Sequence, residues 1–356
     1  MKNTPIGFFV LIALTLTSFL PAADPPKYRG AMISPGGFHE PDLKVLGEEW
    51  NANLVRWQMN WGFPHGNADT ATVDEYNSWI ESSCKLLDAM LPSLRASGVK
   101  VCLDLHTSPG GFNGKNINRM FEEELFADAF VETWRRLATR YKDEKTIWAY
   151  DILNEPVESD DKNDTTYITW RELAIRTSKA IREIDTETPI IFEPSNWCGP
   201  THFVGLVPLD ISNVIYSVHM YHPLEFTHQG VFNSNDDWIP ILYPGEINGV
   251  YWDKAKLRDI LAPVLAFQQK YGVNIYVGEF SAIRWAPDNS AYRYLKDVIE
   301  IFEEYGWNWT YHAFREWSGW SVEHPEDRTN NSPVTEPTDR ELLLRSYFEK
   351  NVRVVE

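Results

Sequence analysis

Two glutamates follow short apolar runs of this 356-residue chain and form a natural chemical pair. Glu155 comes directly after the run 147–153, and Glu279 comes directly after the run 275–278. A charged carboxylate at the end of a buried run is costly unless it is paired, so each glutamate is either held in an ion pair or takes part in chemistry. Glycoside hydrolysis needs two carboxyl groups that flank one bond, one protonated and one ionised. We interpret Glu155 as a general acid/base and Glu279 as a nucleophile.

Polar and aromatic side chains stand near these glutamates in the same pattern, at or close to the ends of apolar runs. Asn154 can bind a substrate hydroxyl. Arg56 and Tyr221 are expected to keep Glu279 ionised through charge and hydrogen bonding, whereas burial should raise the pKa of Glu155. An ordinary ion pair remains the alternative role for Arg56. The residues predicted to bind substrate or support the pair are Arg56, His106, Asn154, His219, Tyr221 and Trp317.

Four further carboxylates lie in or beside strand-like runs and compete for a catalytic role. Asp104 and Asp151 fall before their runs end, so we expect them lower in the fold, accepting hydrogen bonds. Glu193 ends its run and could touch substrate. Glu316 neighbours Trp317, and strand alternation would point these two side chains to opposite faces.

The runs that carry these residues alternate with longer amphipathic segments. Strands are predicted at Arg29–Ser34, Asn53–Asn60, Lys100–His106, Thr146–Asn154, Pro189–Pro194, Val214–Tyr221, Asn274–Phe280 and Trp307–Trp317. Helices are predicted at Asp42–Trp50, Val73–Ser97, Met120–Tyr141, Thr166–Ile184, Lys254–Tyr271, Asn289–Tyr305 and Glu341–Lys350. Eight such units predict an α/β fold of the closed (β/α)8 TIM barrel type, in which strand ends build the active site. The alternative, a doubly wound sheet, would carry a glycine-rich phosphate loop after its first strand, and none is present.

The long connection His222–Asp253 interrupts this regular alternation. It contains six aromatic side chains: Phe226, Phe232, Trp238, Tyr243, Tyr251 and Trp252. Long connections of this kind are usually functional or disordered, and so many rings argue against disorder. We predict an ordered loop that forms one wall of the cleft, and packing of the rings onto the barrel is the alternative.

The N-terminal segment is predicted to be a secretory signal peptide over residues 1–23. Lys2 precedes an apolar run from Ile6 to Leu20, and small residues lead up to Asp24. A retained membrane anchor is the alternative. Residues 24–356 then form a single catalytic domain, which we expect to be monomeric. The formal net charge of −18 argues against a nucleic-acid partner and suits an exported protein that acts on a neutral substrate away from membranes.

Cysteines and histidines leave two further hypotheses open. The three cysteines, Cys84, Cys102 and Cys198, match no zinc spacing and are predicted to be packed residues, with one disulfide possible. A metal-dependent hydrolase using His106, His219 and His222 is an alternative function. Nucleophile-elbow, zinc-helix and Walker motifs are absent from the sequence, which disfavours esterase, metalloprotease and nucleotide-binding functions.

Taken in order, these motifs resemble glycoside hydrolase family 5, the cellulase-like family of clan A. Asn154-Glu155-Pro156 is similar to the family's acid/base motif, and Gly278-Glu279-Phe280 is similar to its nucleophile motif. The likeness covers residues 29–320 and also includes Arg56, the segment Asp104-Leu105-His106, His219 with Tyr221, and Trp317, which matches the tryptophan beneath the reacting sugar.

The resemblance implies a retaining β-glycan hydrolase that acts through a covalent glycosyl-enzyme and needs no cofactor or metal. The carboxyl groups of Glu155 and Glu279 should then lie roughly 5–5.5 Å apart. Members of the family cut cellulose-type and other β-glucans or β-mannan, so the substrate is expected to be a β-linked oligo- or polysaccharide. Exo-acting β-glucosidase or β-1,3-glucanase activity, and a non-catalytic carbohydrate-binding protein on a degenerate barrel, are the alternatives.

Overall fold

The computed structural model describes residues 1, 26–59, 69–161, 166–232 and 238–353, so almost all of the predicted signal peptide lies outside the described residues. Eight parallel strands close into a barrel in the order β1-β10-β9-β6-β5-β4-β3-β2, which confirms the predicted (β/α)8 barrel and excludes the open sheet. The barrel strands are β1 Arg29–Ile33, β2 Leu54–Met59, β3 Lys100–Leu105, β4 Ile147–Asp151, β5 Ile190–Phe192, β6 Val214–Met220, β9 Asn274–Phe280 and β10 Asn308–Phe314.

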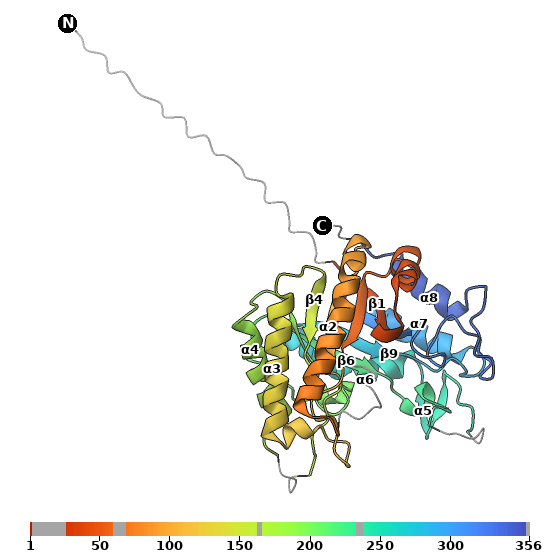
Figure 1. Ribbon diagram of the computed structural model, residues 1–356. Coiled ribbons are helices and arrows are strands. Elements are labelled where there is room, and N and C mark those ends of the chain that lie inside the picture. Colours follow the sequence, from red (N-terminus) through yellow and green to blue (C-terminus); the bar gives the residue numbers. More distant parts are fainter. Residues whose placement is uncertain (2–25, 60–68, 162–165, 233–237, 354–356) are drawn as a thin grey trace.

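Helices surround the barrel, as Figure 1 shows. They are α1 Glu40–Leu43, α2 Val73–Ala96, α3 Glu124–Tyr141, α4 Trp170–Arg182, α5 Leu224–Thr227, α6 Lys254–Tyr271, α7 Ser290–Glu304 and α8 Asp339–Phe348. Within the described ranges, none of them has the length and apolar character needed to cross a membrane.

Local sequence signals fix where several helices begin and end. Thr72 and Glu75 form a capping box at the start of α2, and Thr169 and Glu172 do the same for α4. These reciprocal bonds satisfy backbone N–H groups that have no partner inside the helix. Gly272 ends α6 in the left-handed conformation, which glycine adopts without steric cost.

The inside of the barrel is built in two layers with different chemistry. The lower layer is a small apolar cluster whose buried members are Leu54, Cys102, Ala149, Ile191, Ile215 and Tyr276. Side chains two residues further along a strand point to the same face and lie one layer nearer its C-terminal end. That second layer is polar and fully buried, and it contains Arg56, Asp104, Asp151, Glu193 and Ser217. The layering places a charged cluster directly beneath the mouth of the barrel.

Close packing of neighbouring strands depends on Gly30 in β1. A Cβ atom added at this residue would lie 1.6 Å from the carbonyl oxygen of Leu54 in β2. Because that neighbour is backbone, no side-chain rotation can relieve the clash. Gly30 therefore allows β1 to pair with β2 in the observed register.

Two of the predicted strands end three residues early in the structure. β10 ends at Phe314 instead of continuing to Trp317, because the chain leaves the strand at Arg315, whose φ is 52°. β4 ends at Asp151, so Asn154 and Glu155 lie on the loop that follows it. These two residues therefore reach the barrel mouth from irregular backbone.

The connection 222–253 is ordered in its described parts, and residues 233–237 lie outside them. It contains α5 and an antiparallel hairpin of β7 Gly245–Ile247 and β8 Val250–Trp252. Both predicted roles are present, since Phe232 lines the cavity at the barrel mouth while Phe226 and Tyr243 are buried in the core. All three cysteines are buried and free, which confirms that they are packed residues and excludes the disulfide.

Candidate active site

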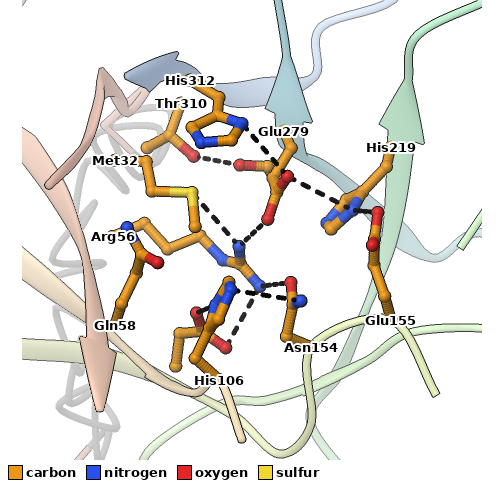
Figure 2. Close-up of polar contacts among 12 residues, drawn as sticks. Met32, Arg56, Gln58, His106, Asn154, Glu155, His219, Glu279, Thr310 and His312 are labelled. Atoms are coloured by element: carbon orange, nitrogen blue, oxygen red, sulfur yellow. Dashed lines mark hydrogen bonds and ion pairs between the residues drawn. The ribbon is translucent and has the colours of Figure 1, made fainter. Parts of the chain in front are cut away.

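A cavity of 710 Å³ lies at the C-terminal mouth of the barrel and is bordered by loops that follow the strands. It is lined by both predicted catalytic glutamates and by four of the six predicted supporting residues; Arg56 lies beneath it. These lining residues are His106, Asn154, Glu155, His219, Tyr221 and Glu279. Figure 2 shows most of them converging on Arg56 and Glu279.

Glu155 is held from two sides at the edge of the cavity. Its backbone N–H donates to Glu193 Oε2 at 2.7 Å, and its carboxylate Oε1 lies 2.7 Å from His219 Nδ1. Its side chain keeps 21% of its surface exposed, so substrate can reach it. Burial and the nearby charge of Glu279 raise the pKa of Glu155 despite its hydrogen bond to His219. The position therefore favours a protonated carboxyl group that faces the cavity.

Glu155 also has strained backbone, with a φ of 43°. A left-handed conformation is uncommon for a residue with a side chain and costs of order 1–3 kcal/mol. The hydrogen bond from its N–H to Glu193 fixes this conformation, which points the carboxyl group at His219.

Glu279 lies opposite, at the end of β9, among groups that favour its ionised form. Arg56 Nη1 donates to Oε1 at 2.7 Å, and the Tyr221 hydroxyl donates to Oε2 at 2.9 Å. Burial alone would raise the pKa of Glu279, but His219, His312 and Arg56 together hold it well below its usual value. One oxygen of Glu279 lies within 4.8 Å of an oxygen of Glu155. That spacing is below the separation of inverting glycosidases and fits the retaining class.

Arg56 is the centre of the buried charged layer. Besides Glu279, its guanidinium contacts Asp151 at 3.0 Å and both Glu193 and Asp104 at 3.1 Å. All of these side chains except Glu279, at 6%, have no exposed surface. Burial and the charge of Glu193 raise the pKa of Asp151 well above its usual value, in spite of Arg56, which favours a proton on this residue. As predicted, Asp104 and Asp151 lie low and serve the polar network.

A fixed orientation of His106 and Asn154 follows from the same network. Arg56 Nη2 donates to Asn154 Oδ1 at 3.0 Å, so the amide nitrogen of Asn154 faces the other way, toward His106 Nε2 at 3.4 Å. His106 Nδ1 lies 2.7 Å from Asp104 Oδ2. Both side chains therefore present polar atoms to the cavity from positions set by buried charged groups, Arg56 for Asn154 and Asp104 for His106.

His219 links the two levels of the site. Its Nδ1 faces Glu155, and its Nε2 lies 3.0 Å from Glu193 Oε1. Burial would lower the pKa of this imidazole, but Glu193, Glu279 and Glu155 outweigh it and raise the pKa well above 6.5. Room for the ring depends on Gly278, where a Cβ would lie 2.7 Å from Nε2. Glu193 is thus a buried support for His219 and Glu155, not the substrate contact considered from the sequence.

The position of Trp317 differs from the one predicted for it at the end of the eighth strand. Trp317 lies beyond the end of β10, is 41% exposed, packs against Trp285 and Trp320, and does not line the cavity. The buried Trp320 does not line the cavity either, but its ring packs against those of Tyr221 and His312, which do. The early end of β10 explains the shift.

Several lining residues were not predicted as site residues. Gln58, His312 and Glu316 border the cavity, and so do Phe112 and Trp197, whose ring centroids lie 6.4 Å apart. Strand parity could have identified Gln58, which is two residues after Arg56. The two aromatic residues lie on loops, whose conformation the sequence does not encode as a period.

The described part of the chain contains two groups of side chains that could hold a metal ion, Glu193–Cys198–His219 and Glu155–His219–Glu279. Neither is the trio His106, His219 and His222 considered above. Both share His219, whose ring nitrogens already face Glu155 and Glu193. The metal-dependent alternative therefore has no support from the positions of these histidines.

The barrel and its facing carboxyl groups define a glycosidase-type site, and comparison with known proteins identifies the family. The model of cellulase, glycosyl hydrolase family 5, matches residues 30–318, and the chain belongs to this family. It is therefore an enzyme of the retaining β-glycan hydrolase class.

Individual relatives support the same assignment. Endoglucanase C of Acetivibrio thermocellus is 29% identical over 298 residues, covering 76% of this chain and 83% of the relative. Cellodextrinase A of Ruminococcus flavefaciens is 25% identical over 275 residues and covers 75% of each chain. A crystal structure described as a glycoside hydrolase aligns with a TM-score of 0.71 and 26% identity over 92% of this chain and 100% of its own.

Proposed function

We propose that Glu279 is the nucleophile and Glu155 the acid/base of a double-displacement hydrolysis of β-linked glucans. The observation that carries this proposal is the pair itself. Two carboxyl groups face each other within 4.8 Å in one cavity, and their surroundings move their pKa values in opposite directions. Divergent pKa values in a carboxyl pair are the arrangement that assigns one acid and one ionised partner.

The chemistry follows from these two states. Ionised Glu279 attacks the anomeric carbon and forms a glycosyl ester, while Glu155 gives its proton to the departing glycosidic oxygen. Glu155, now ionised, takes a proton from water as the water attacks the ester and releases Glu279. Arg56 and Tyr221 hold the attacking carboxylate in place, and His219 orients Glu155. His106 and Asn154 are proposed to bind hydroxyl groups of the reacting sugar.

Cellulose-type β-glucan is the proposed substrate class, with β-mannan as the second candidate. The proposal draws on the printed names of the relatives, an endoglucanase and a cellodextrinase. It is supported by exposed rings along the cavity, Phe112, Trp197 and Phe232, which can stack on the apolar faces of sugars.

Export by the segment 1–23 remains part of the proposal, as do a single catalytic domain over 24–356 and a monomeric state. A polymeric substrate outside the cytoplasm requires a secreted or periplasmic enzyme. Release of the segment can be checked by N-terminal sequencing of the exported protein.

The test is hydrolysis of β-1,4-glucan, β-1,3-glucan and β-mannan by the wild type and by Glu155→Gln and Glu279→Gln. Each variant should lose about 10²–10⁴-fold or more in kcat on the best substrate while remaining folded. The matched control is Glu183→Gln, which changes an exposed carboxylate paired with Arg135 far from the cavity. Undiminished activity in either site variant would contradict the assignment. Binding without turnover by the wild type on every glycan would instead favour a carbohydrate-binding protein.

A further inference from the structure

A continuous row of side chains leads to the nucleophile from the side opposite Glu155. Gln58 Nε2 lies 2.5 Å from Glu316 Oε2, and Glu316 Oε1 lies 3.2 Å from His312 Nε2. His312 Nδ1 lies 2.5 Å from the Tyr221 hydroxyl, which contacts Glu279 Oε2. We call these five residues the donor chain. Figure 2 shows His312 beside Glu279.

The direction of the hydrogen bonds is fixed at the Gln58 end. Its Nε2 also lies 3.1 Å from the backbone carbonyl of Ile33, which can only accept, so the nitrogen must face that carbonyl. The same nitrogen therefore donates to Glu316, which accepts on Oε2 as a carboxylate. Glu316 then presents its other oxygen, Oε1, to His312 as an acceptor.

The direction at the other end is fixed by Glu279. An ionised nucleophile accepts the proton of the Tyr221 hydroxyl, so the phenolic oxygen is left to accept a bond from His312 Nδ1. His312 thus faces an acceptor at each ring nitrogen. It satisfies both only as an imidazolium that donates from Nδ1 to Tyr221 and from Nε2 to Glu316.

We propose that His312 is a positioning residue whose protonation state decides whether Tyr221 donates its hydrogen bond to the nucleophile. Protonated His312 fills the acceptor site of the Tyr221 oxygen and sends the phenolic proton to Glu279. When His312 loses its Nδ1 proton, that nitrogen becomes an acceptor, and the Tyr221 hydroxyl turns to it. Glu279 then loses one hydrogen bond and the charge of a nearby cation. The inference rests on the proposed role of Glu279.

The charged groups around His312 favour the protonated form. Glu279 Oε2 lies 3.4 Å from Nδ1, and Glu316 faces Nε2, whereas Arg56 and His228 oppose a second positive charge. Burial also opposes it, but the two carboxylates outweigh these effects and raise the pKa of His312 above 6.5. These contacts therefore favour the imidazolium, which is lost as the pH rises through the raised pKa.

The kinetic test uses a β-cellobioside with a 2,4-dinitrophenol leaving group, which departs without a proton from Glu155. For this substrate, the pH dependence of kcat/KM reports the nucleophile side of the site, and its plateau lies below the alkaline limb. His312→Phe removes both donors and should lower the plateau about 10- to 100-fold, the value of one hydrogen bond to a charged group. His312→Asn places an uncharged donor near the Nδ1 position and should restore much of the activity.

The pH profiles separate positioning from simple packing. The wild type should lose kcat/KM at alkaline pH, Glu316→Gln should lose it at a lower pH, and His312→Asn should lack this loss. The matched control is His39→Asn at the exposed start of α1, which should reproduce the wild-type profile. Identical alkaline limbs in the wild type, Glu316→Gln and His312→Asn would overturn the proposal.

Nitrogen-15 NMR of histidine-labelled protein gives a readout that needs no activity. The His312 signals, assigned by their absence in His312→Asn, should show both ring nitrogens protonated at pH 7 and should titrate at lower pH in Glu316→Gln. A neutral His312 ring at pH 7 would overturn the inference. A protonated ring in a protein that hydrolyses no glycoside would leave the donor chain intact and contradict the proposed function instead.

Discussion

Replacing Arg56 by methionine is the perturbation with the largest expected effect on stability. The guanidinium is fully buried and contacts four carboxylates, those of Asp104, Asp151, Glu193 and Glu279, at 2.7–3.1 Å. Methionine fills much of the same space but removes the cation that these four acids share. The variant therefore isolates the electrostatic role of Arg56 from its packing.

The magnitude follows from the cost of leaving a buried ion pair with one partner, about 3–5 kcal/mol in the free energy of unfolding. At about 2 °C per kcal/mol for a large domain, Tm should fall by roughly 6–10 °C at pH 7. Arg56 helps to hold the pKa values of Glu193 and Glu279 below their usual range. Acids of this kind stabilise the fold above their unfolded pKa, and this contribution is lost as the pH falls. The deficit of the variant should therefore be nearly constant above the usual glutamate pKa of 4.5 and should shrink as the pH falls below it.

Thermal unfolding of the wild type and of Arg56→Met between pH 2.5 and pH 8 checks this reasoning. The control is Arg135→Met, which removes a 39% exposed arginine paired with Glu183 and should cost less than about 1 kcal/mol. Equal losses in the two variants, or an Arg56→Met deficit that does not change with pH, would refute the account of the buried layer.

Three further outcomes follow from the structure. Hydrolysis should persist below pH 4.5 in folded protein, because the pKa of Glu279 is held well below that usual value; loss of activity near pH 4.5 would argue against its surroundings as described. Trp197→Ala should raise KM for long glucans severalfold and change kcat little, whereas an unchanged KM would remove this ring from substrate binding. Gly30→Ala should lower Tm sharply, because its Cβ meets the Leu54 carbonyl; a wild-type Tm would show that β1 can shift.

The barrel could be predicted because its signals are local and repeat along the chain. Apolar strand runs and amphipathic helices alternate, and polar residues at strand ends mark the mouth, which is why Arg56, Glu155 and Glu279 could be identified. Strand parity also placed His219 and Tyr221 on one side, and the structure brings both to Glu279 or Glu155.

The rest depends on features with no sequence period. The strand predicted to extend to Trp317 ends three residues earlier, and the ring from this region that packs against His312 is that of Trp320. Phe112 and Trp197 meet across two loops. Glu193 directly follows β5, a position at which a side chain can contact substrate. It is nevertheless fully buried, because it forms ion pairs with Arg56 and His219 in the polar layer.

Trapping the covalent intermediate tests the central claim most directly. The reagent is a 2-deoxy-2-fluoro-β-cellobioside with a dinitrophenol leaving group. The fluorine slows both formation and hydrolysis of the glycosyl-enzyme, and the good leaving group speeds formation alone. The covalent intermediate therefore accumulates. Peptide mass spectrometry of the labelled wild type should place the sugar on Glu279, with no label in Glu279→Gln. A sugar attached to any other residue, or an active enzyme that never carries a label, would contradict the assignment of Glu279 as the nucleophile.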